Sequence, residues 1–266
     1  MTNPVLPNPY EISGIRHETD MEYTFRVATD IKPGHGQFLQ LSIPKIGEVP
    51  ISVSDQGDGW LEFTIRKVGK VTNVIFEKMA GDTLFMRGPY GRGWPMDDLR
   101  GKHLIVIAGG TGVSPVRSLL NYCAREPGFA KSVSLICGFR NRDSILFADD
   151  LAVWKQKFNT WFCLDECCAV RDKDWLEGFV TEQIRHLPMQ DYSENYAICV
   201  VGPPLMMQHT GEELIRQGFC GEHIWLSFER KMSCAIGKCG HCRIDEVYVC
   251  LEGPVFPYSV AKNLVD

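Results

Sequence analysis

Short hydrophobic runs rich in β-branched and aromatic residues recur through the first hundred positions and predict strands. Segments rich in glycine, proline and aspartate separate them and favour turns, one of them at 46–48. This spacing predicts a small antiparallel β-barrel. A helix is expected at 71–79, and the glycine-rich stretch 88–94 is expected to be neither helix nor strand. The predicted strands are 10–15, 22–28, 37–43, 51–55, 60–67 and 83–87.

The hydrophobic pattern changes after residue 100. A continuous apolar run at 103–108 is typical of a parallel strand buried on both faces, and a glycine turn and a helical pattern follow it. Strand and helix patterns then alternate, which predicts an α/β domain with a mostly parallel sheet. Further strands are expected at 132–138, 159–165, 196–201 and 224–228, and helices at 147–157, 180–187 and 208–217.

At 266 residues the chain has room for about two domains and an appendage. The predicted fold class is β plus α/β. We expect a β-barrel domain at 1–100, an α/β domain at 101–228 and a small cysteine-rich lobe at 229–266.

Three loops follow predicted strands of the α/β domain. The carboxyl ends of parallel strands lie at one edge of the sheet, and ligands bind there. We therefore expect the three loops to converge on that edge and to form a nucleotide site. A tight structural turn is the alternative reading of the first loop. The loops contribute Gly109, Gly110, Thr111 and Gly112, then Gly138 and Arg140, then Gly202 and Pro203.

Two segments of the predicted barrel are candidates for holding a flavin. Residues 49–54 place serine hydroxyls along a strand, and 69–72 offer a glycine turn, a cation and a hydroxyl at a helix start. Taken alone, the first can equally be an ordinary strand and the second an ordinary helix cap.

Four cysteines near the end of the chain form a C-x4-C-x2-C-x7-C pattern: Cys234, Cys239, Cys242 and Cys250. The first three match the plant-type [2Fe-2S] spacing. Gly237 and Gly240 suit a tightly curled loop, and Cys250 is expected on a strand after a hairpin at 243–249. A zinc site, which usually has two C-x2-C pairs, and a purely structural cysteine group remain alternatives.

Composition excludes some classes of function. The net charge of −5 gives no general reason to bind nucleic acid, and no apolar run is long enough to span a membrane. The chain has eleven cysteines and no secretory signal, so we expect free thiols in a reducing cytoplasm. We expect no second metal site at Cys163, Cys167 and Cys168, and His241 is expected to face solvent or a partner.

In this order, the barrel segments, the Gly-Gly-Thr-Gly turn, Gly-Pro-Pro-Leu-Met-Met and the cysteine loop resemble the ferredoxin–NADP reductase-like electron-transfer subunits. These include subunits of dihydroorotate dehydrogenase B and sulfhydrogenase gamma subunits. Residues 49–55, 65–73, 227–242 and 249–256 are most similar to the B subunits of anaerobic sulfite reductases.

The resemblance implies FAD in the barrel, NADH at the α/β domain and one [2Fe-2S] cluster held by the four cysteines. NADH would pass a hydride to the flavin, and single electrons would reach the cluster and then partner subunits with iron–sulfur centres and a sirohaem that reduce sulfite to sulfide. Ser52 would hydrogen-bond flavin N5. The other implied FAD contacts are Pro50, Ile51, Val53, Gly69, Val71 and Thr72.

Two departures from the family pattern are visible. The flavin strand lacks its usual arginine, which is Val49 here, so Lys67, Lys70 or backbone donors would have to replace it. The last nucleotide motif has Val201 in place of the usual cysteine, with Cys199 two residues earlier. Arg140 and Arg142 favour NADPH whereas Asp143 opposes it; following the resemblance we expect NADH. One alternative is that the chain is the electron-transfer subunit of a hydrogenase or of a dihydroorotate dehydrogenase. Another is that it is a non-enzymatic iron–sulfur sensor.

Overall fold

A computed structural model describes residues 5–166, 175–188, 192 and 195–264. By compactness the chain forms two units: Met1–Trp94 with Glu229–Pro254, and Pro95–Phe228 with Val255–Asp266. Residues 229–266 thus do not form a compact unit of their own. The functional boundaries expected at 100/101 and 228/229 stay a prediction.

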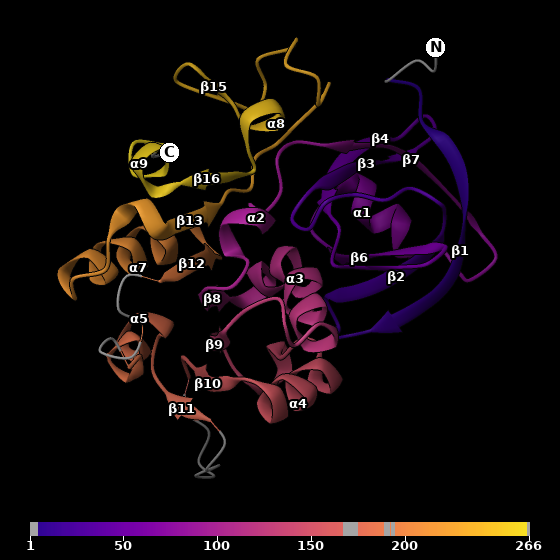
Figure 1. Ribbon diagram of the computed structural model, residues 1–266. Coiled ribbons are helices and arrows are strands. Elements are labelled where there is room, and N and C mark those ends of the chain that lie inside the picture. Colours follow the sequence, from indigo (N-terminus) through magenta and orange to yellow (C-terminus); the bar gives the residue numbers. More distant parts are fainter. Residues whose placement is uncertain (1–4, 167–174, 189–191, 193–194, 265–266) are drawn as a thin grey trace. The chain divides into compact units, whose positions relative to one another are not determined.

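The first unit is built on one antiparallel seven-stranded sheet with the order β4-β3-β7-β1-β2-β6-β5. Its strands curve around a common interior (Figure 1), which is filled by apolar side chains such as Phe25, Leu39 and Phe63. The helix α1 (Lys70–Ile75) adds Ile75 to this core. The strands are β1 (Asn8–His17), β2 (Glu22–Ala28), β3 (Phe38–Ile43), β4 (Gly47–Ser52), β5 (Asp55–Gly57), β6 (Trp60–Arg66) and β7 (Thr83–Tyr90).

Two predictions in this unit are wrong. The strand expected at 51–55 is β4, which begins at Gly47, because the chain turns at 44–46 and pairs directly with β3. Pro50 is tolerated there since β4 is an edge strand. The stretch 88–94 was expected to be neither helix nor strand, yet β7 continues through Tyr90, and a register shift opposite Phe38 accommodates the glycine and proline.

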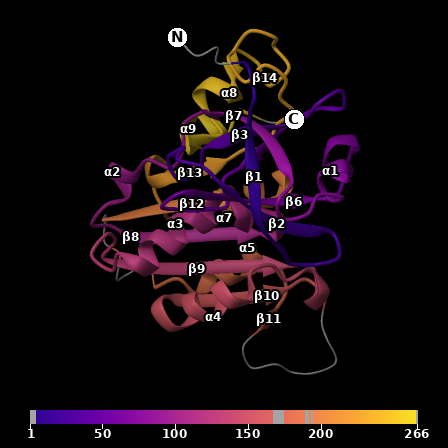
Figure 2. The same ribbon diagram turned by 90° about the vertical axis from the view of Figure 1, so that its right-hand side faces the viewer.

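The second unit has a seven-stranded sheet with the order β11-β10-β9-β8-β12-β13-β16. Every pairing is parallel except the last, between β13 and β16. Helices α3 and α4 cover one face and α5 and α7 the other (Figures 1 and 2). The strands are β8 (His103–Gly109), β9 (Ser132–Phe139), β10 (Asn159–Leu164), β11 (Leu176–Glu177), β12 (Tyr196–Val201), β13 (Ile224–Ser227) and β16 (Val255–Pro257).

The helices of this unit are α2 (Met96–Leu99), α3 (Val113–Arg125), α4 (Ala148–Lys157), α5 (Val180–Gln183), α7 (Pro204–Arg216) and α9 (Tyr258–Ala261). The helix expected to begin at Gln208 begins four residues earlier, at Pro204. Proline suits a first helical turn because that turn needs no amide hydrogen from it. The helix expected at 180–187 is α5 followed by a 3-10 turn, Ile184–His186.

The cysteine-rich segment contains a short hairpin, β14 (Arg243–Ile244) and β15 (Val247–Tyr248), and the helix α8 (Val249–Glu252). The expected hairpin is therefore confirmed. Cys250, expected on a strand, lies instead on α8. The β plus α/β fold class is confirmed.

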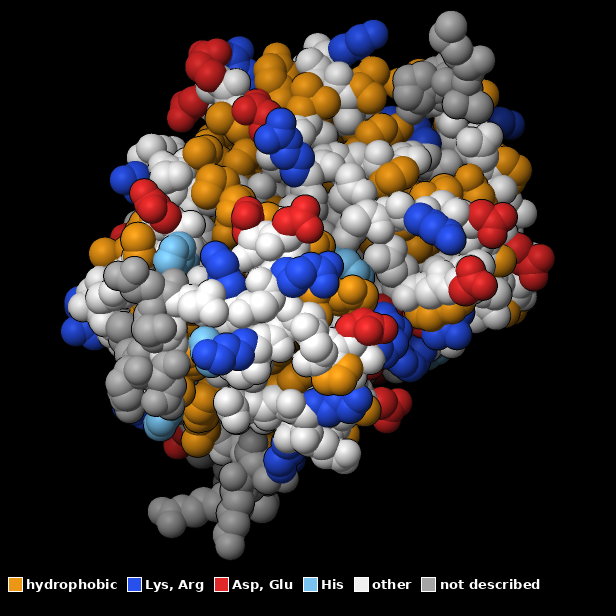
Figure 3. Space-filling view, viewed as in Figure 1, with side chains coloured by type: hydrophobic (Ala, Val, Ile, Leu, Met, Phe, Trp, Pro, Cys, Tyr) orange, Lys and Arg blue, Asp and Glu red, His pale blue; other side chains and the backbone are white. Residues whose placement is uncertain are grey.

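None of the helices in the described residues is both long and apolar enough to cross a membrane. On the face shown in Figure 3, basic and acidic side chains are interspersed rather than gathered by sign. The second cysteine group expected to be inert includes Cys163, which is fully buried, whereas Cys167 and Cys168 lie outside the described residues.

Candidate functional site

The four cysteines of the C-terminal pattern come together as two pairs. Cys234 shares a side-chain hydrogen bond with Cys239, and Cys250 shares one with Cys242. Within the described residues, no three His, Cys, Asp or Glu side chains are grouped so as to hold one metal ion. Two pairs suit a two-iron cluster, because such a cluster takes four cysteine thiolates, two for each iron. The donor set therefore fits a [2Fe-2S] cluster.

The loop backbone is shaped around these sulfur atoms. Gly237 and Gly240 have φ values of 69° and 74°, which confirms the expected tight curl. A side chain at Gly237 would lie 2.2 Å from Leu251 Cδ1, so glycine is also required there by space. The backbone N–H of Gly237 points at Cys250 Sγ, 3.3 Å away, and that of Lys238 points at Cys234 Sγ, also at 3.3 Å.

These amide groups change the acidity of the thiols. Burial acts to raise the pKa of Cys234, but hydrogen bonds from the N–H groups of Ile236, Lys238 and Cys239 lower it to about 6. Burial, together with the hydrogen bond that its thiol donates to Cys242, raises the pKa of Cys250 to about 12. The loop thus favours a thiolate, the form that binds iron, at its first cysteine. His241, between two of the cysteines, is exposed.

An arginine that the sequence pattern did not reveal holds the start of this loop. Arg87, on β7, is buried and donates hydrogen bonds to the carbonyl oxygens of Ser233 and Cys234, each at 2.8 Å. Its guanidinium also pairs with Glu48 on β4, with an Nη2–Oε2 distance of 2.5 Å.

The predicted nucleotide loops do converge on one edge of the parallel sheet. Gly109 pairs with Gly138 in the β8–β9 register, and Ala108 pairs with Val201 in the β8–β12 register. A side-chain carbon at Gly112 would lie 2.6 Å from Gly202 Cα, so these two loops touch through their backbones. Gly110 has a φ of 55°, the left-handed conformation that glycine tolerates best. Thr111 is the middle residue of the 3-10 turn Gly110–Gly112, which leads into α3.

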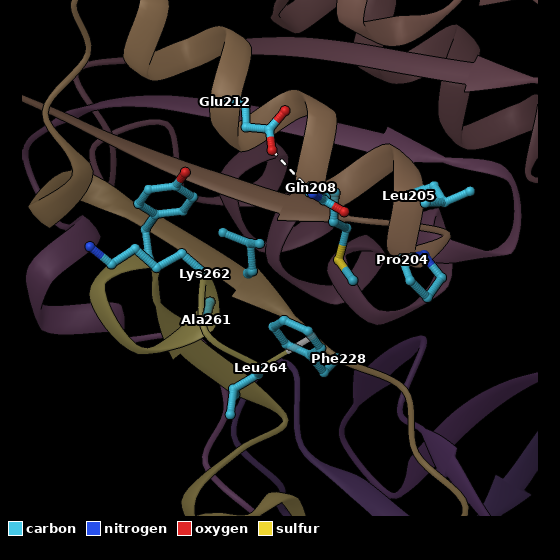
Figure 4. Close-up of a pocket in the computed structure, with 11 residues that line it drawn as sticks. Pro204, Leu205, Gln208, Glu212, Phe228, Ala261, Lys262 and Leu264 are labelled. Carbon is cyan, nitrogen blue, oxygen red and sulfur yellow. Dashed lines mark hydrogen bonds between the residues drawn. The ribbon is translucent and has the colours of Figure 1, made fainter. Parts of the chain in front are cut away.

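Met206, the third residue of α7, packs over two of these glycines. Added carbons at Gly109 and Gly202 would lie 2.4 and 2.6 Å from its sulfur. A small pocket of about 130 Å³ opens beside the same loop, lined by Pro204, Leu205, Gln208 and Phe228 among others (Figure 4). It is smaller than the roughly 300–1,000 Å³ typical of small-molecule sites, so the glycine edge remains the nucleotide candidate.

Two side chains near the nucleotide edge, Arg140 and Cys199, are already engaged within the protein. Arg140 is exposed and its Nε lies 2.7 Å from Glu166 Oε1, so the cation already has an acidic partner. That pairing raises the pKa of Arg140 and lowers that of Glu166. Cys199 is fully buried within the sheet, and burial raises its pKa well above normal. Its thiol is therefore a core group.

The strand proposed to hold the flavin has one available hydroxyl. Ser52, at the end of β4, is half-buried, and its hydroxyl has no hydrogen-bond partner in the part of the chain that the structure describes. Ser54 is fully buried and accepts a hydrogen bond from Thr64 Oγ1 at 3.0 Å. Pro50 and Ile51 are half-buried along β4, whereas the side chain of Val53 belongs to the barrel core.

The 69–72 turn is held by its own threonine. The hydroxyl of Thr72 accepts hydrogen bonds from the backbone N–H groups of Val68 and Gly69 and donates to the carbonyl of Gly69. Thr72 therefore shapes this turn, and Val71 packs partly against the barrel core.

Gln40 supplies an independent sign that a polar molecule belongs on this face of the barrel. It lies on β3 between Pro50 of β4 and Arg87 of β7 in the strand register, and it is fully buried. Neither atom of its amide has a hydrogen-bond partner in the described part of the chain. Because an unsatisfied buried polar group costs about 1–3 kcal/mol, a bound cofactor with polar atoms fits here.

Two family models match parts of the chain. A family model described as an oxidoreductase NAD-binding domain matches residues 106–212. A second, described as the iron–sulfur cluster binding domain of dihydroorotate dehydrogenase B, matches residues 229–260. These matches contain the glycine loops and the four cysteines respectively.

Two relatives come from Pyrococcus furiosus. The sulfhydrogenase 1 subunit gamma is 35% identical over an alignment of 273 positions, which covers 94% of this chain and 92% of that protein. A probable dihydroorotate dehydrogenase B electron-transfer subunit is 31% identical over 244 residues, or 91% of this chain and 85% of that protein.

Among solved structures, a chain of an NADH-dependent reduced ferredoxin–NADP oxidoreductase superposes with a TM-score of 0.78 at 22% identity. The match covers 94% of this chain and 88% of that one. The chain therefore has a ferredoxin–NADP reductase-like, FAD-type fold with an NAD-binding domain and an iron–sulfur domain.

Proposed function

Since the chain belongs to the family of ferredoxin–NADP reductase-like electron-transfer subunits that includes sulfhydrogenase gamma and dihydroorotate dehydrogenase B subunits, we propose that it oxidises NADH and delivers single electrons to partner subunits. The observation that carries this proposal is that Cys234, Cys239 and Cys242 of the glycine-bent loop and Cys250 of α8 come together as two thiol pairs. Bound FAD supplies the conversion of a hydride into single electrons, and the [2Fe-2S] cluster supplies a one-electron carrier.

The chain's part in this chemistry is to bind and orient. The first loop brings backbone to the edge of the parallel sheet through Gly109, Gly110, Thr111 and Gly112. Gly112 lies so close to Gly202 that it has no room for a side chain. The NADH pyrophosphate would therefore meet backbone N–H groups at this edge. Gly138 and Arg140 would border the ribose side, and Gly202 and Pro203 the nicotinamide side. No side chain is required to act as a general acid or base.

Ser52 is proposed to hydrogen-bond flavin N5. Its hydroxyl lies on an edge strand and has no hydrogen-bond partner among the described residues, which supports this role. Ser54, the other serine of this segment, is buried and already bonded to Thr64, so it is a poorer candidate. Pro50 and Ile51 would border the flavin with their side chains and Val53 with its backbone alone, because the Val53 side chain lies in the barrel core. Gly69, Val71 and Thr72 would form the turn that faces the phosphates.

We expect Ser52→Ala to slow hydride transfer by about tenfold, since one lost hydrogen bond to a reacting group is worth roughly 1–2 kcal/mol. Stopped-flow measurement of flavin reduction by NADH checks this. Ser13→Ala, at an exposed serine that only bonds the carbonyl of Arg26, is the matched control. An unchanged rate in Ser52→Ala would remove the residue from the mechanism.

NADH is the proposed nucleotide because the cation that would attract a 2′-phosphate is already paired. Arg140 contacts Glu166, and Asn141 Nδ2 lies 3.4 Å from the same carboxylate. An acid in this position repels a phosphate and can accept from a ribose hydroxyl.

Dye reduction should therefore be at least about tenfold faster with NADH than with NADPH at equal concentration, because the Glu166 carboxylate repels the extra 2′-phosphate and already pairs with the cation that would attract it. Glu166→Gln should narrow this ratio by releasing Arg140. Equal rates with the two nucleotides in the unmodified protein would contradict the assignment.

For the partner, we propose the catalytic and iron–sulfur subunits of a sulfite reductase that forms sulfide. The proposal is supported by the resemblance of residues 49–55, 65–73, 227–242 and 249–256 to the B subunits of anaerobic sulfite reductases. A hydrogenase partner is the second candidate, favoured by the 35% identity with the sulfhydrogenase gamma subunit.

Copurification of the tagged chain from its native host, followed by assay of the complex, tests the partner. NADH-dependent loss of sulfite with formation of sulfide is the expected result. A complex that exchanges electrons between NADH and hydrogen, or one that oxidises dihydroorotate, and is inactive with sulfite would overturn the sulfite assignment.

A further inference from the structure

Arg87 joins the barrel to the iron–sulfur loop from a position 147 residues before the first cysteine. Only 5% of the residue is exposed. Its Nη1 group donates to the carbonyl of Cys234 and its Nη2 group to that of Ser233, both at 2.8 Å. These two carbonyls stand at the beginning of the ligand loop, so the guanidinium fixes the backbone from which Cys234 projects.

Every N–H direction of this guanidinium is used. Besides the two loop carbonyls, Nη1 donates to the Tyr90 hydroxyl at 3.0 Å, and Nε and Nη2 donate to the Glu48 carboxylate. Five N–H donors in a planar fork therefore have acceptors on all sides, which lysine could not reproduce. Such a fully bonded cation resists movement, and it holds the loop in one position relative to β7.

The partner of this cation has a different environment. The Glu48 side chain is 27% exposed, whereas that of Arg87 is 4% exposed. Arg87 also contacts the loop directly, whereas among the described residues the Glu48 carboxylate accepts hydrogen bonds from Arg87 alone. The positive member of the pair is thus the one next to the iron–sulfur loop, and the negative member lies behind it.

We propose that Arg87 and Glu48 act as a positioning and charge-setting pair for the [2Fe-2S] cluster, a role that rests on the proposed electron-transfer function. Reduction adds one negative charge to the cluster. Arg87 stabilises that charge and raises the reduction potential, whereas Glu48 destabilises it and lowers the potential. With both residues present, the potential lies between the values that each residue alone would give. Because the charges are opposite in sign, their removal has opposite effects.

The test is a redox titration of the purified, cluster-loaded protein, followed by the electron paramagnetic resonance signal of the reduced cluster. Arg87→Gln should make the cluster about tenfold harder to reduce and Glu48→Gln about tenfold easier, each close to 59 mV for one electron. The double variant should return to near the unmodified value. If the pair had a purely structural role, the reduction potential would shift in the same direction in both single variants. That result, or no shift in either variant, overturns the proposal.

Two further variants serve as controls for the redox titration. Arg117 forms a second buried arginine–carboxylate pair, with its Nε 2.6 Å from Asp150 Oδ2 on α4, and Arg117→Gln should leave the potential unchanged. If Arg87→Gln does not retain iron, Arg87→Lys, which keeps the charge, should stay near the unmodified potential while Glu48→Gln still shifts upward. An Arg87→Lys protein with the lowered potential expected of Arg87→Gln contradicts the charge argument.

The outcome also separates this inference from the function on which it rests. Absence of any [2Fe-2S] signal in the unmodified protein would defeat the proposed function itself. A normal signal whose potential is indifferent to Arg87 and Glu48 would defeat only the role of the pair.

Discussion

Replacing Cys239 by alanine is expected to lower NADH-driven electron delivery to the partner by more than about 100-fold, because loss even of an outer partner of a metal ligand costs 10–100-fold. Cys239 lies on the exposed side of the loop and pairs with Cys234. Reduction of a small dye directly by the NADH-reduced flavin should continue near the normal rate, since the barrel and the nucleotide loops are untouched. Iron content and the two rates, measured on the same preparation, check this.

Cys220 provides the matched control for this prediction. It is another exposed free cysteine, but it lies in the α/β unit and outside the four-cysteine pattern. Cys220→Ala should retain iron and deliver electrons normally. A Cys239→Ala protein that drives the partner at the normal rate would show that the cluster is not on the route.

Gly112→Ala is expected to disable the nucleotide edge. The new carbon would meet Gly202 Cα at 2.6 Å and both Gly202 N and Val201 O at 2.7 Å, and none of these backbone atoms can rotate away. We expect a loss of about 1–3 kcal/mol in the free energy of unfolding, as for other overpacking substitutions. Because the displaced loops are those proposed to hold NADH, kcat/KM for NADH should fall by up to about 100-fold.

Urea denaturation and steady-state dye reduction measure these two effects. Gly128→Ala is the control, because an added carbon there meets nothing within 4 Å and the position lies away from the edge. It should change stability by less than about 0.5 kcal/mol. A Gly112→Ala protein with normal kcat/KM for NADH would separate this loop from the nucleotide.

Much of the fold was predictable because the relevant patterns are local. The apolar run that became β8 and the glycine turn after it specify a buried parallel strand and a tight entry into α3. The hydrophobic pattern was less informative where pairing with another strand determines which residues form a strand. β4 lies four residues earlier than predicted because the turn at 44–46 sets its register with β3.

The site divides in the same way. The cysteine spacing and the positive φ values at Gly237 and Gly240 are properties of one short loop, so the sequence indicates them directly. Arg87 and Gln40 gave no such signal, since an arginine in Met-Arg-Gly-Pro and a glutamine within a hydrophobic strand are ordinary. Only the β3–β7 register and the contact of β7 with Ser233 and Cys234 reveal them.

The most direct test of the whole account is an anaerobic titration of the purified chain with NADH, without any partner, followed by absorbance and electron paramagnetic resonance. The account predicts that NADH bleaches the flavin bands and produces the signal of a reduced [2Fe-2S] cluster in the same sample. Flavin bleaching in a cluster-loaded protein whose cluster stays oxidised with NADH, yet is reduced by dithionite, would contradict the claim that this chain passes electrons from NADH to its cysteine-bound cluster.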